Sequence, residues 1–192
     1  MVFVLNSHKS LESLGLFLAE QCLNVEQGET ILVCGNRYAE NYLVSLSRAF
    51  EKLGAKVVLN LWSDQTLIGL IRGVGPGEAS KAWVPRPKGF NEIETVGGVI
   101  RGVDKVLTLF SSPLESFLCP GTSTSVFEVF GESWKKFTAS TLSHIKLCEE
   151  KGLFLVLLDW PSKKEVERLG LNADWCRKTY LEALKVNYQD IR

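Results

Sequence analysis

The chain is poor in the residues that build catalytic and metal centres. Its 192 residues include only two histidines, His8 and His144. Its five cysteines are scattered and show no CxxC spacing, so they predict neither a zinc site nor a disulfide framework. The motifs HExxH, GxSxG and GxxxxGK[ST], which mark zinc peptidases, serine hydrolases and P-loop nucleotide-binding proteins, are missing. Taken alone, the sequence therefore predicts no catalytic residue and no metal ligand set.

The charge and hydropathy patterns exclude further classes of partner. The chain carries 22 basic and 22 acidic residues, which argues against a nucleic-acid or anionic-membrane surface. It has no run of about 18 apolar residues, so no membrane-spanning segment is expected. Cys22, Cys34 and Cys148 lie at apolar periodic positions and read as small core residues. We therefore expect a cytoplasmic protein without nucleic-acid or membrane partners.

Residues 28–61 have the pattern of a complete strand–helix–strand unit. A short apolar run at 30–34 is typical of a buried parallel strand, and apolar residues then recur at helical spacing until Gly54. Further apolar runs follow, at 56–61, 105–110 and 153–158. Strands alternating with helices predict an α/β fold. We expect a single domain over 1–192, with a Rossmann-like, open, mostly parallel sheet of about four to five strands and helices on both faces.

The remaining segments are more varied. A first amphipathic helix is predicted over about 9–25, and a last one runs from Asn172 towards Arg192. No Gly or Asn cap follows the last apolar residue of that helix, which fits either a cut chain or a short natural terminus. Several glycines and prolines make 73–90 an irregular excursion, either a long loop or an edge hairpin around 82–84. Such a length without regular structure indicates a functional segment or an interface.

The candidate ligand-binding residues are those that follow strands, because ligands bind open parallel sheets at the carboxyl ends of the strands. Asn36 and Arg37 follow the first strand, and Ser111 and Ser112 follow the third. Gly35 is a single glycine where a dinucleotide-binding loop needs three, so a pyrophosphate is not expected there. Arg37 beside a helix start suits a carboxylate or phosphate, although an ordinary surface arginine is the simpler interpretation.

Other reactive side chains give weaker signals. His144 and Cys148 are four residues apart on a predicted helix, a spacing that suits a packing pair better than two metal ligands. Cys119 lies in a loop without a neighbour that would lower its pKa, so it makes a weak nucleophile. Either Thr124 or Ser125 caps the start of a predicted helix. Three lone carboxylates lie near strand ends: Asp64, Asp104 and Asp159.

The order of residues along the chain resembles a known family. Segments 18–33 and 39–57, the latter ending in Leu53-Gly54-Ala55, resemble the opening of metallo-aminopeptidases of the thermophilic aminopeptidase T and S type, which are leucyl aminopeptidase-like. Val103-Asp104-Lys105 and segment 160–171 fit the same scheme. The loop at Gly35 lacks the family's usual Gly-Pro, and residues 62–125 depart from its pattern. A diverged relative therefore stays an open alternative.

The resemblance implies a role without chemistry. In that family a two-metal site of the zinc or cobalt type, with Glu, His, Tyr and Asp ligands, lies in a carboxyl-terminal domain that this chain does not contain. By resemblance, this chain is an amino-terminal scaffold that assembles a homodimer and shapes substrate access, and it meets peptide substrate only within the full-length protein. The alternatives are a stand-alone small-molecule-binding module and a homo-oligomeric interaction protein that uses 73–90 at its contact.

Overall fold

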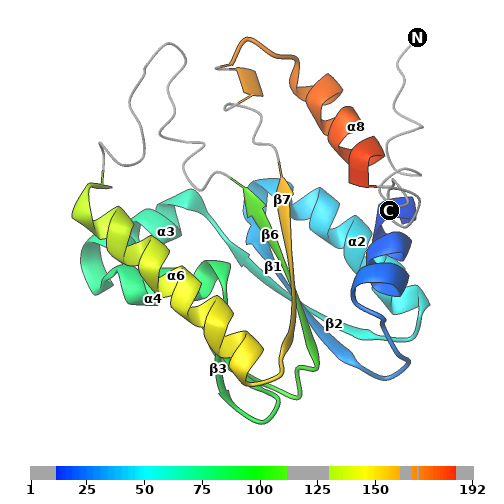
Figure 1. Ribbon diagram of the computed structural model, residues 1–192, viewed down its shortest axis with the longest axis horizontal. Coiled ribbons are helices and arrows are strands. Elements are labelled where there is room, and N and C mark those ends of the chain that lie inside the picture. The colour runs from blue at the N-terminus through cyan, green and yellow to red at the C-terminus, as the bar shows by residue number, and fades with distance from the viewer. Residues whose placement is uncertain (1–11, 112–129, 161–165, 168, 185–192) are drawn as a thin grey trace.

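A four-stranded parallel sheet forms the centre of the molecule (Figure 1). The computed structural model describes residues 12–111, 130–160, 166–167 and 169–184. The strands lie in the order β2-β1-β6-β7, which confirms the predicted open parallel sheet. Each strand extends one or two residues beyond its predicted end. Their bounds are β1 Thr30–Asn36, β2 Lys56–Trp62, β6 Lys105–Ser111 and β7 Phe154–Trp160.

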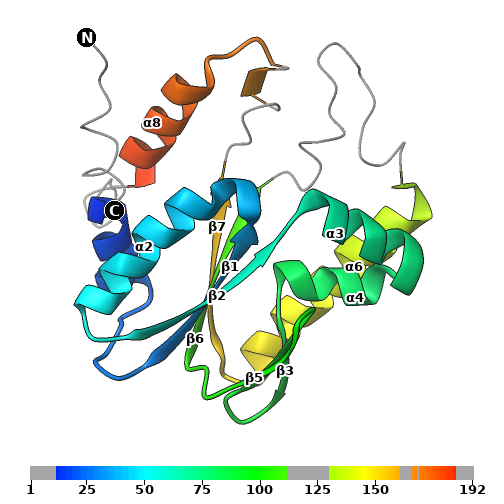
Figure 2. The same ribbon diagram turned by 180° about the vertical axis from the view of Figure 1, so that it is seen from behind.

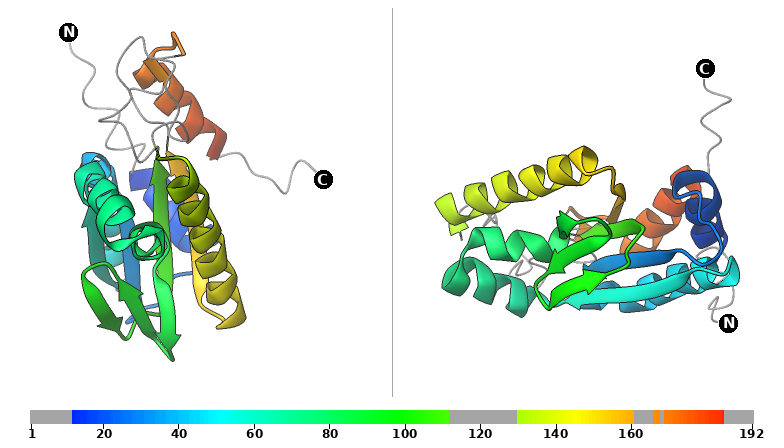
Figure 3. Two further views of the ribbon diagram at one scale, coloured as in Figure 1. Left: turned by 90° about the vertical axis from the view of Figure 1, so that its left-hand side faces the viewer. Right: turned by 90° about the horizontal axis from the view of Figure 1, so that it is seen from below.

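Helices cover both faces of this sheet, as predicted (Figures 2 and 3). Helical residues 12–22, which end in the π-helical turn η1 (Leu18–Cys22), lie on one face with α2 (Glu40–Lys52). The other face carries α4 (Pro76–Trp83) and α6 (Glu132–Glu150). The elements between these are η2 (Arg37–Ala39), α3 (Asp64–Gly69) and η3 (Leu70–Val74).

Alternate residues of β1 enter two different cores. Ile31 and Val33 pack with α2 residues such as Phe50, whereas Leu32 and Cys34 join a cluster on the opposite face. A strand covered on both faces must be apolar at every position, which explains the continuous apolar run. A third core, between the helices on the second face, is rich in aromatic side chains: Trp62, Trp83, Phe130, Trp134 and Phe137.

The segment predicted to be irregular is ordered, so that prediction was wrong. Pro76 occupies the first turn of α4, where a missing N–H costs nothing, and Gly75 takes a positive φ of 119° just before it. The expected hairpin around 82–84 is absent because Ala82 and Trp83 close this helix. A second, antiparallel sheet follows, with β3 (Arg86–Gly89), β4 (Glu92–Thr95) and β5 (Gly98–Arg101) in that order.

The starts of α6 (Glu132–Glu150) and of the last helix are marked by the residues that precede them. Gly131 stands at the start of α6 with a positive φ of 49°. Asn172 Oδ1 accepts a hydrogen bond from the Trp175 amide at 2.9 Å, so the last helix, α8 (Ala173–Leu184), begins where predicted. Several predictions lie outside the described residues: those on Ser112, Cys119, Thr124, Ser125 and the segment 185–192.

Candidate functional site at the carboxyl ends of the strands

The two central strands of the parallel sheet, β1 and β6, stop pairing with each other before either strand ends. β1 pairs with β2 as far as Asn36 opposite Trp62, and β6 pairs with β7 as far as Ser111 opposite Trp160. The pairing between β1 and β6 stops earlier, at Cys34 opposite Thr108. The strand order also reverses here, since β2 follows β1 on one side and β6 lies on the other. Such a switch point is where open α/β sheets bind ligands.

Asn36, a predicted ligand-binding residue, is buried and bonded inside the protein. Its side chain is 1% exposed. Its Nδ2 donates to Asp64 Oδ1 at 2.5 Å, and its Oδ1 accepts from the Tyr38 amide at 3.2 Å. Asn36 therefore caps η2 and ties the end of β1 to the start of α3. Asn36 positions the backbone of these two segments and does not present a free amide to a ligand.

Asp64, predicted as a lone carboxylate near a strand end, is the hydrogen-bond partner of Asn36. It begins α3, directly after Ser63, whose hydroxyl caps that helix by accepting from the Thr66 amide at 3.1 Å. Burial to 8% exposure and the bond from Asn36 make it part of the same edge. Sequence position could have indicated the contact between Asn36 and Asp64, because both residues lie at the ends of adjacent parallel strands.

Arg37 and Ser111 are the other two described candidates. Arg37 is exposed in η2, and no described carboxylate forms an ion pair with it. Ser111 ends β6, so the fold brings both residues to the same edge of the sheet. Gly35 belongs to β1 rather than to a loop. A Cβ there would lie 2.6 Å from Leu43 Cδ1, so this glycine serves close packing of strand and helix.

A buried serine–histidine contact joins α4 to α6. Ser80 Oγ and the carbonyl oxygen of Val84 each lie 3.2 Å from His144 Nδ1. The carbonyl can only accept, so Nδ1 carries the hydrogen and cannot take a proton from Ser80. Ser80 itself donates to the Gly77 carbonyl at 2.8 Å. Burial is the main cause that lowers the pKa of His144. This contact is a structural link between two helices.

The other predicted side chains take structural positions. Cys148 Sγ lies 3.6 Å from the Pro85 carbonyl, one residue beyond the carbonyl that His144 binds, which fits the expected packing pair. Asp104 precedes β6, where its carboxylate accepts from the Thr30 amide at 2.8 Å and from Asn91 Nδ2 at 3.2 Å. Across the described ranges, no three His, Cys, Asp or Glu side chains gather as a metal site would require.

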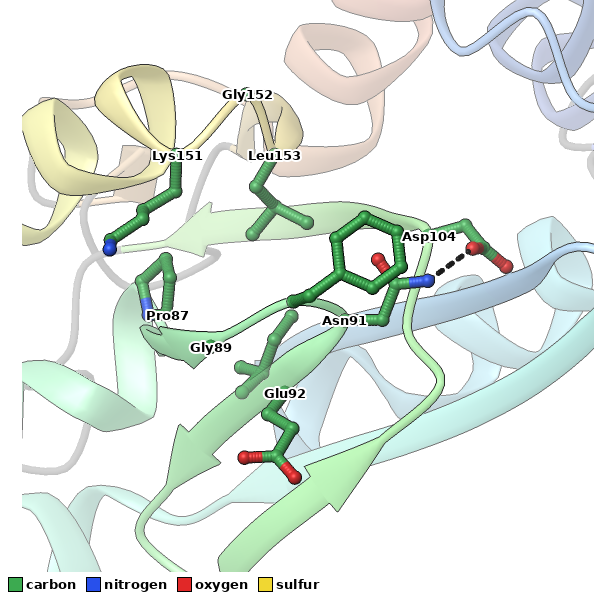
Figure 4. A pocket seen from close by; sticks show the side chains of 10 residues that line it. Pro87, Gly89, Asn91, Glu92, Asp104, Lys151, Gly152 and Leu153 are labelled. Carbon is green, nitrogen blue, oxygen red and sulfur yellow. Dashed lines mark hydrogen bonds between the residues drawn. The ribbon is translucent and has the colours of Figure 1, made fainter.

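A pocket does lie at the opposite edge of the sheet, near the amino ends of β6 and β7 (Figure 4). Asn91 and Asp104 meet on one side of it, and Lys151 and Leu153 lie on another. The carboxylate of Asp104 is already bound to Thr30 and Asn91, as described above. This pocket is therefore separate from the edge that carries Asn36, Arg37 and Ser111.

Comparisons with known proteins identify a related fold. No protein-family model matches the chain, and no curated protein matches it either. Among solved structures, it is similar to wild-type AmpT from Thermus thermophilus, with a TM-score of 0.53 and 12% identity. The likeness covers 92% of this chain and 42% of that one. At this identity it shows a shared α/β fold. None of the helices in the described ranges is long and apolar enough to cross a membrane.

Proposed function

We propose that the chain is a non-catalytic α/β domain of an aminopeptidase T-type metallopeptidase, or a diverged relative of such a domain. Its role is to support assembly and substrate access, and the metal chemistry belongs to a further domain. The chemistry of that further domain, a divalent metal of the zinc or cobalt type acting on peptide, follows from the sequence resemblance. A reducing cytoplasm suits the four described free thiols: Cys22, Cys34, Cys148 and Cys176.

One observation carries this proposal. The fold of AmpT from Thermus thermophilus matches 92% of this chain, yet the chain spans less than half of AmpT, 42%. A domain that accounts for part of a larger protein gives this relation between the two coverages. The sequence resemblance at residues 18–57 points to the same family independently of the fold comparison.

Two measurements test the proposal. The purified chain should not hydrolyse leucine p-nitroanilide when zinc or cobalt is added, and metal-dependent turnover would contradict the non-catalytic role. The reading frame supplies the positive test. A continuation beyond Arg192 into sequence that contains Glu, His and Asp ligands would support the peptidase context. A stop codon there would leave the stand-alone relative as the better description.

The parted strands β1 and β6 favour a second candidate function, the binding of a small anionic molecule. Arg37 supplies an exposed cation at the switch point, on the same edge of the sheet as Ser111, which ends β6 and precedes Ser112 in the sequence. A carboxylate or phosphate would suit that guanidinium. A thermal-shift screen of nucleotides, phosphates and amino acids should then give a stabilised hit.

An arginine pair makes this second test specific. Arg37→Ala should abolish the shift, whereas Arg48→Ala, at an exposed position on α2, should leave it unchanged. A shift that survives Arg37→Ala would place the ligand elsewhere. The thermal-shift screen measures ligand binding and the hydrolysis assay measures peptidase activity. Either candidate function can therefore fail while the other stands.

A further inference from the structure

The outer edge of β7 lacks the features that protect edge strands. Its residues, Phe154–Trp160, pair with β6 along one side, and no described strand pairs with the other side. Edge strands of soluble proteins commonly carry a lysine, a proline or a β-bulge, which discourages pairing with a foreign strand. The sequence of β7, FLVLLDW, has neither lysine nor proline, and its register with β6 is continuous over all seven residues.

Both faces of β7 are apolar, and both are partly open at this edge. Val156 and Leu158 pack into the core beneath α2, whereas Leu155 joins the cluster on the opposite face. Phe154 is 47% exposed and Leu157 is 39% exposed, and side chains three positions apart in a strand point to opposite faces. A strand that is apolar on both faces is typical of the interior of a parallel sheet. One further apolar strand outside β7 would cover both exposed side chains.

The first seven residues of the chain match this edge in length and character. Residues 1–5 read MVFVL, so every position is apolar and three of the five are β-branched or aromatic. A strand rises about 3.3 Å per residue, so seven residues extend as far as the seven of β7. Residues 8–11 then connect this segment to the helical residues that the structure describes from residue 12 onward. A connection of about four residues is ordinary between a strand and a helix.

The helical residues 12–22 set the direction of such a strand. They run from the carboxyl edge of the sheet to its amino edge, antiparallel to β1, before the chain turns into β1 at Thr30 (Figures 1 and 2). A strand of this sheet that leads into the start of the helix therefore ends at the carboxyl edge and runs parallel to β1. It would complete a strand–helix–strand crossover, the usual connection between parallel strands.

The handedness of crossovers selects the edge at β7 over the edge at β2. Residues 12–22 and α2 lie on the same face of the sheet, and the crossover from β1 through α2 leads to β2. Crossovers between parallel strands are right-handed in about 98% of cases, and two of them on one face step in the same direction across the sheet. The strand before residues 12–22 therefore belongs on the side of β1 away from β2. There β6 is already paired on both sides, so the outer edge of β7 is the position left.

We propose that residues 1–7 form a fifth strand of the parallel sheet, hydrogen-bonded in parallel along the outer edge of β7. Figures 1 and 2 agree with this side, since residues 12–22 and β7 lie in front of α2 and β2 in the first view and behind them in the second. The added strand covers Phe154 on one face and Leu157 on the other, and its backbone closes an edge that would otherwise accept another chain. This interface goes beyond the proposed domain role and does not depend on any peptidase context.

Engineered disulfides test the position of the segment in the full chain. Leu157→Cys is combined with a second cysteine that replaces residue 2, 3, 4 or 5 in turn, and linked peptides are measured by mass spectrometry after mild oxidation. Cysteines on adjacent strands form a disulfide readily only when their side chains point to the same face. The yield should therefore alternate along residues 2–5, with neighbouring positions differing at least about fivefold.

Leu59→Cys is the matched control, because Leu59 is 41% exposed on β2, the other edge strand. It should give no comparable product with any of the four positions. Preferred linkage to position 59, or yields that do not alternate, would overturn the proposed strand. Linkage that joins two chains and rises with protein concentration would show that a second copy occupies the edge, and the proposal would be wrong.

Hydrogen exchange tests the same strand without new cysteines. Deleting residues 2–6 should speed exchange of the outward-facing amides of residues 154–160 at least about tenfold, because they lose their hydrogen-bond partners. The amides of β1, which is paired on both sides, should stay protected and report an intact fold. Val4→Asp should act like the deletion, since it would bury a charge, whereas Lys9→Asp should not. Equal exchange of residues 154–160 in the wild type and the deletion variant would mean that the edge is unoccupied.

Discussion

Asn36 and Asp64 join the ends of two parallel strands through one short hydrogen bond, 2.5 Å from Nδ2 to Oδ1. Asn36 closes β1, and Asp64 begins α3 two residues after Trp62 closes β2. Both side chains are buried, at 1% and 8% exposure. The bond therefore fixes the carboxyl edge of the sheet on which Arg37 stands, while leaving Asn36 itself unavailable to a ligand.

Replacing Asn36 by alanine should destabilise the fold. Asp64 and the Tyr38 amide would each lose a buried hydrogen-bond partner, which costs about 1–3 kcal/mol. Asn60→Ala is a matched control, because the only described contact of that amide is with Cys34 Sγ at 3.6 Å. Urea unfolding of both variants provides the measurement. Similar losses in the two variants would show that the Asn36–Asp64 bond contributes nothing particular.

Two glycine-to-alanine changes should act in opposite directions. A Cβ at Gly15 would lie 2.7 Å from Ala49 Cβ and 3.3 Å from Leu46 Cα. The Cα is a backbone atom that cannot rotate away, so we expect Gly15→Ala to lower the free energy of unfolding by about 1–3 kcal/mol. Gly69 ends α3 with nothing within 4 Å of an added Cβ, so alanine there should stabilise the helix by about 0.5–1 kcal/mol. Thermal or urea unfolding measures both, and a neutral Gly15→Ala would contradict the close helix contact.

The parallel sheet could be predicted from the sequence because each of its strands leaves a local signal. Strands buried on both faces read as apolar runs, as at residues 30–34 and 153–158. The segment 73–90 could not be predicted in this way. Gly75 and Pro76 punctuate a helix start there, and the buried residues of α4 include small ones such as Ala79 and Ala82, which give a weak amphipathic pattern.

The candidate site was predictable in position but not in detail. The ends of β1 and β6 lie at one edge, as strand order in an α/β sheet requires, so Arg37 and Ser111 do share that edge. The internal role of Asn36 depends on Asp64, 28 residues away in the chain. No local pattern reports a contact over that separation, which is why Asn36 read as a ligand-binding residue.

The stability of the fold should fall below neutral pH through His144. Its burial is the main cause that lowers its folded pKa below 6.5, with Arg86 and Lys81 acting in the same direction, while the Val84 carbonyl and Glu94 oppose them. The unfolded chain therefore binds a proton first as the pH falls. The stabilising contribution of neutral His144 is complete above pH about 6.5, decreases from there to the folded pKa, and then levels off.

His144→Asn isolates this effect. Asparagine keeps an N–H donor near the position of Nδ1 but does not titrate. Urea midpoints measured at pH 7.5 and 5.5 should differ more for the wild type than for the variant. His8, the other histidine, is present in both proteins and cancels from the comparison. An identical pH dependence in the two proteins would show that His144 is protonated equally easily in the folded and unfolded chains.

The two buried cysteines should resist alkylation in the native protein. Burial raises the pKa of Cys34 to about 12 and that of Cys148 to about 12, so almost no thiolate exists near pH 8. Iodoacetamide should therefore modify the partly exposed Cys176 before Cys34 and Cys148, and peptide mass spectrometry reports the rate at each site. Fast native labelling of Cys34 would contradict its buried position in β1.

Unfolding then becomes the route by which Cys34 is labelled, and this gives a check on the Asn36–Asp64 bond by a second readout. When reclosing is faster than alkylation, the labelling rate follows the population of the open form. Asn36→Ala should thus speed the labelling of Cys34 by about tenfold for each 1.4 kcal/mol lost, and Gly69→Ala should slow it. An unchanged rate in Asn36→Ala, despite a lower urea midpoint, would mean that Cys34 is reached by local opening that the Asn36–Asp64 bond does not control.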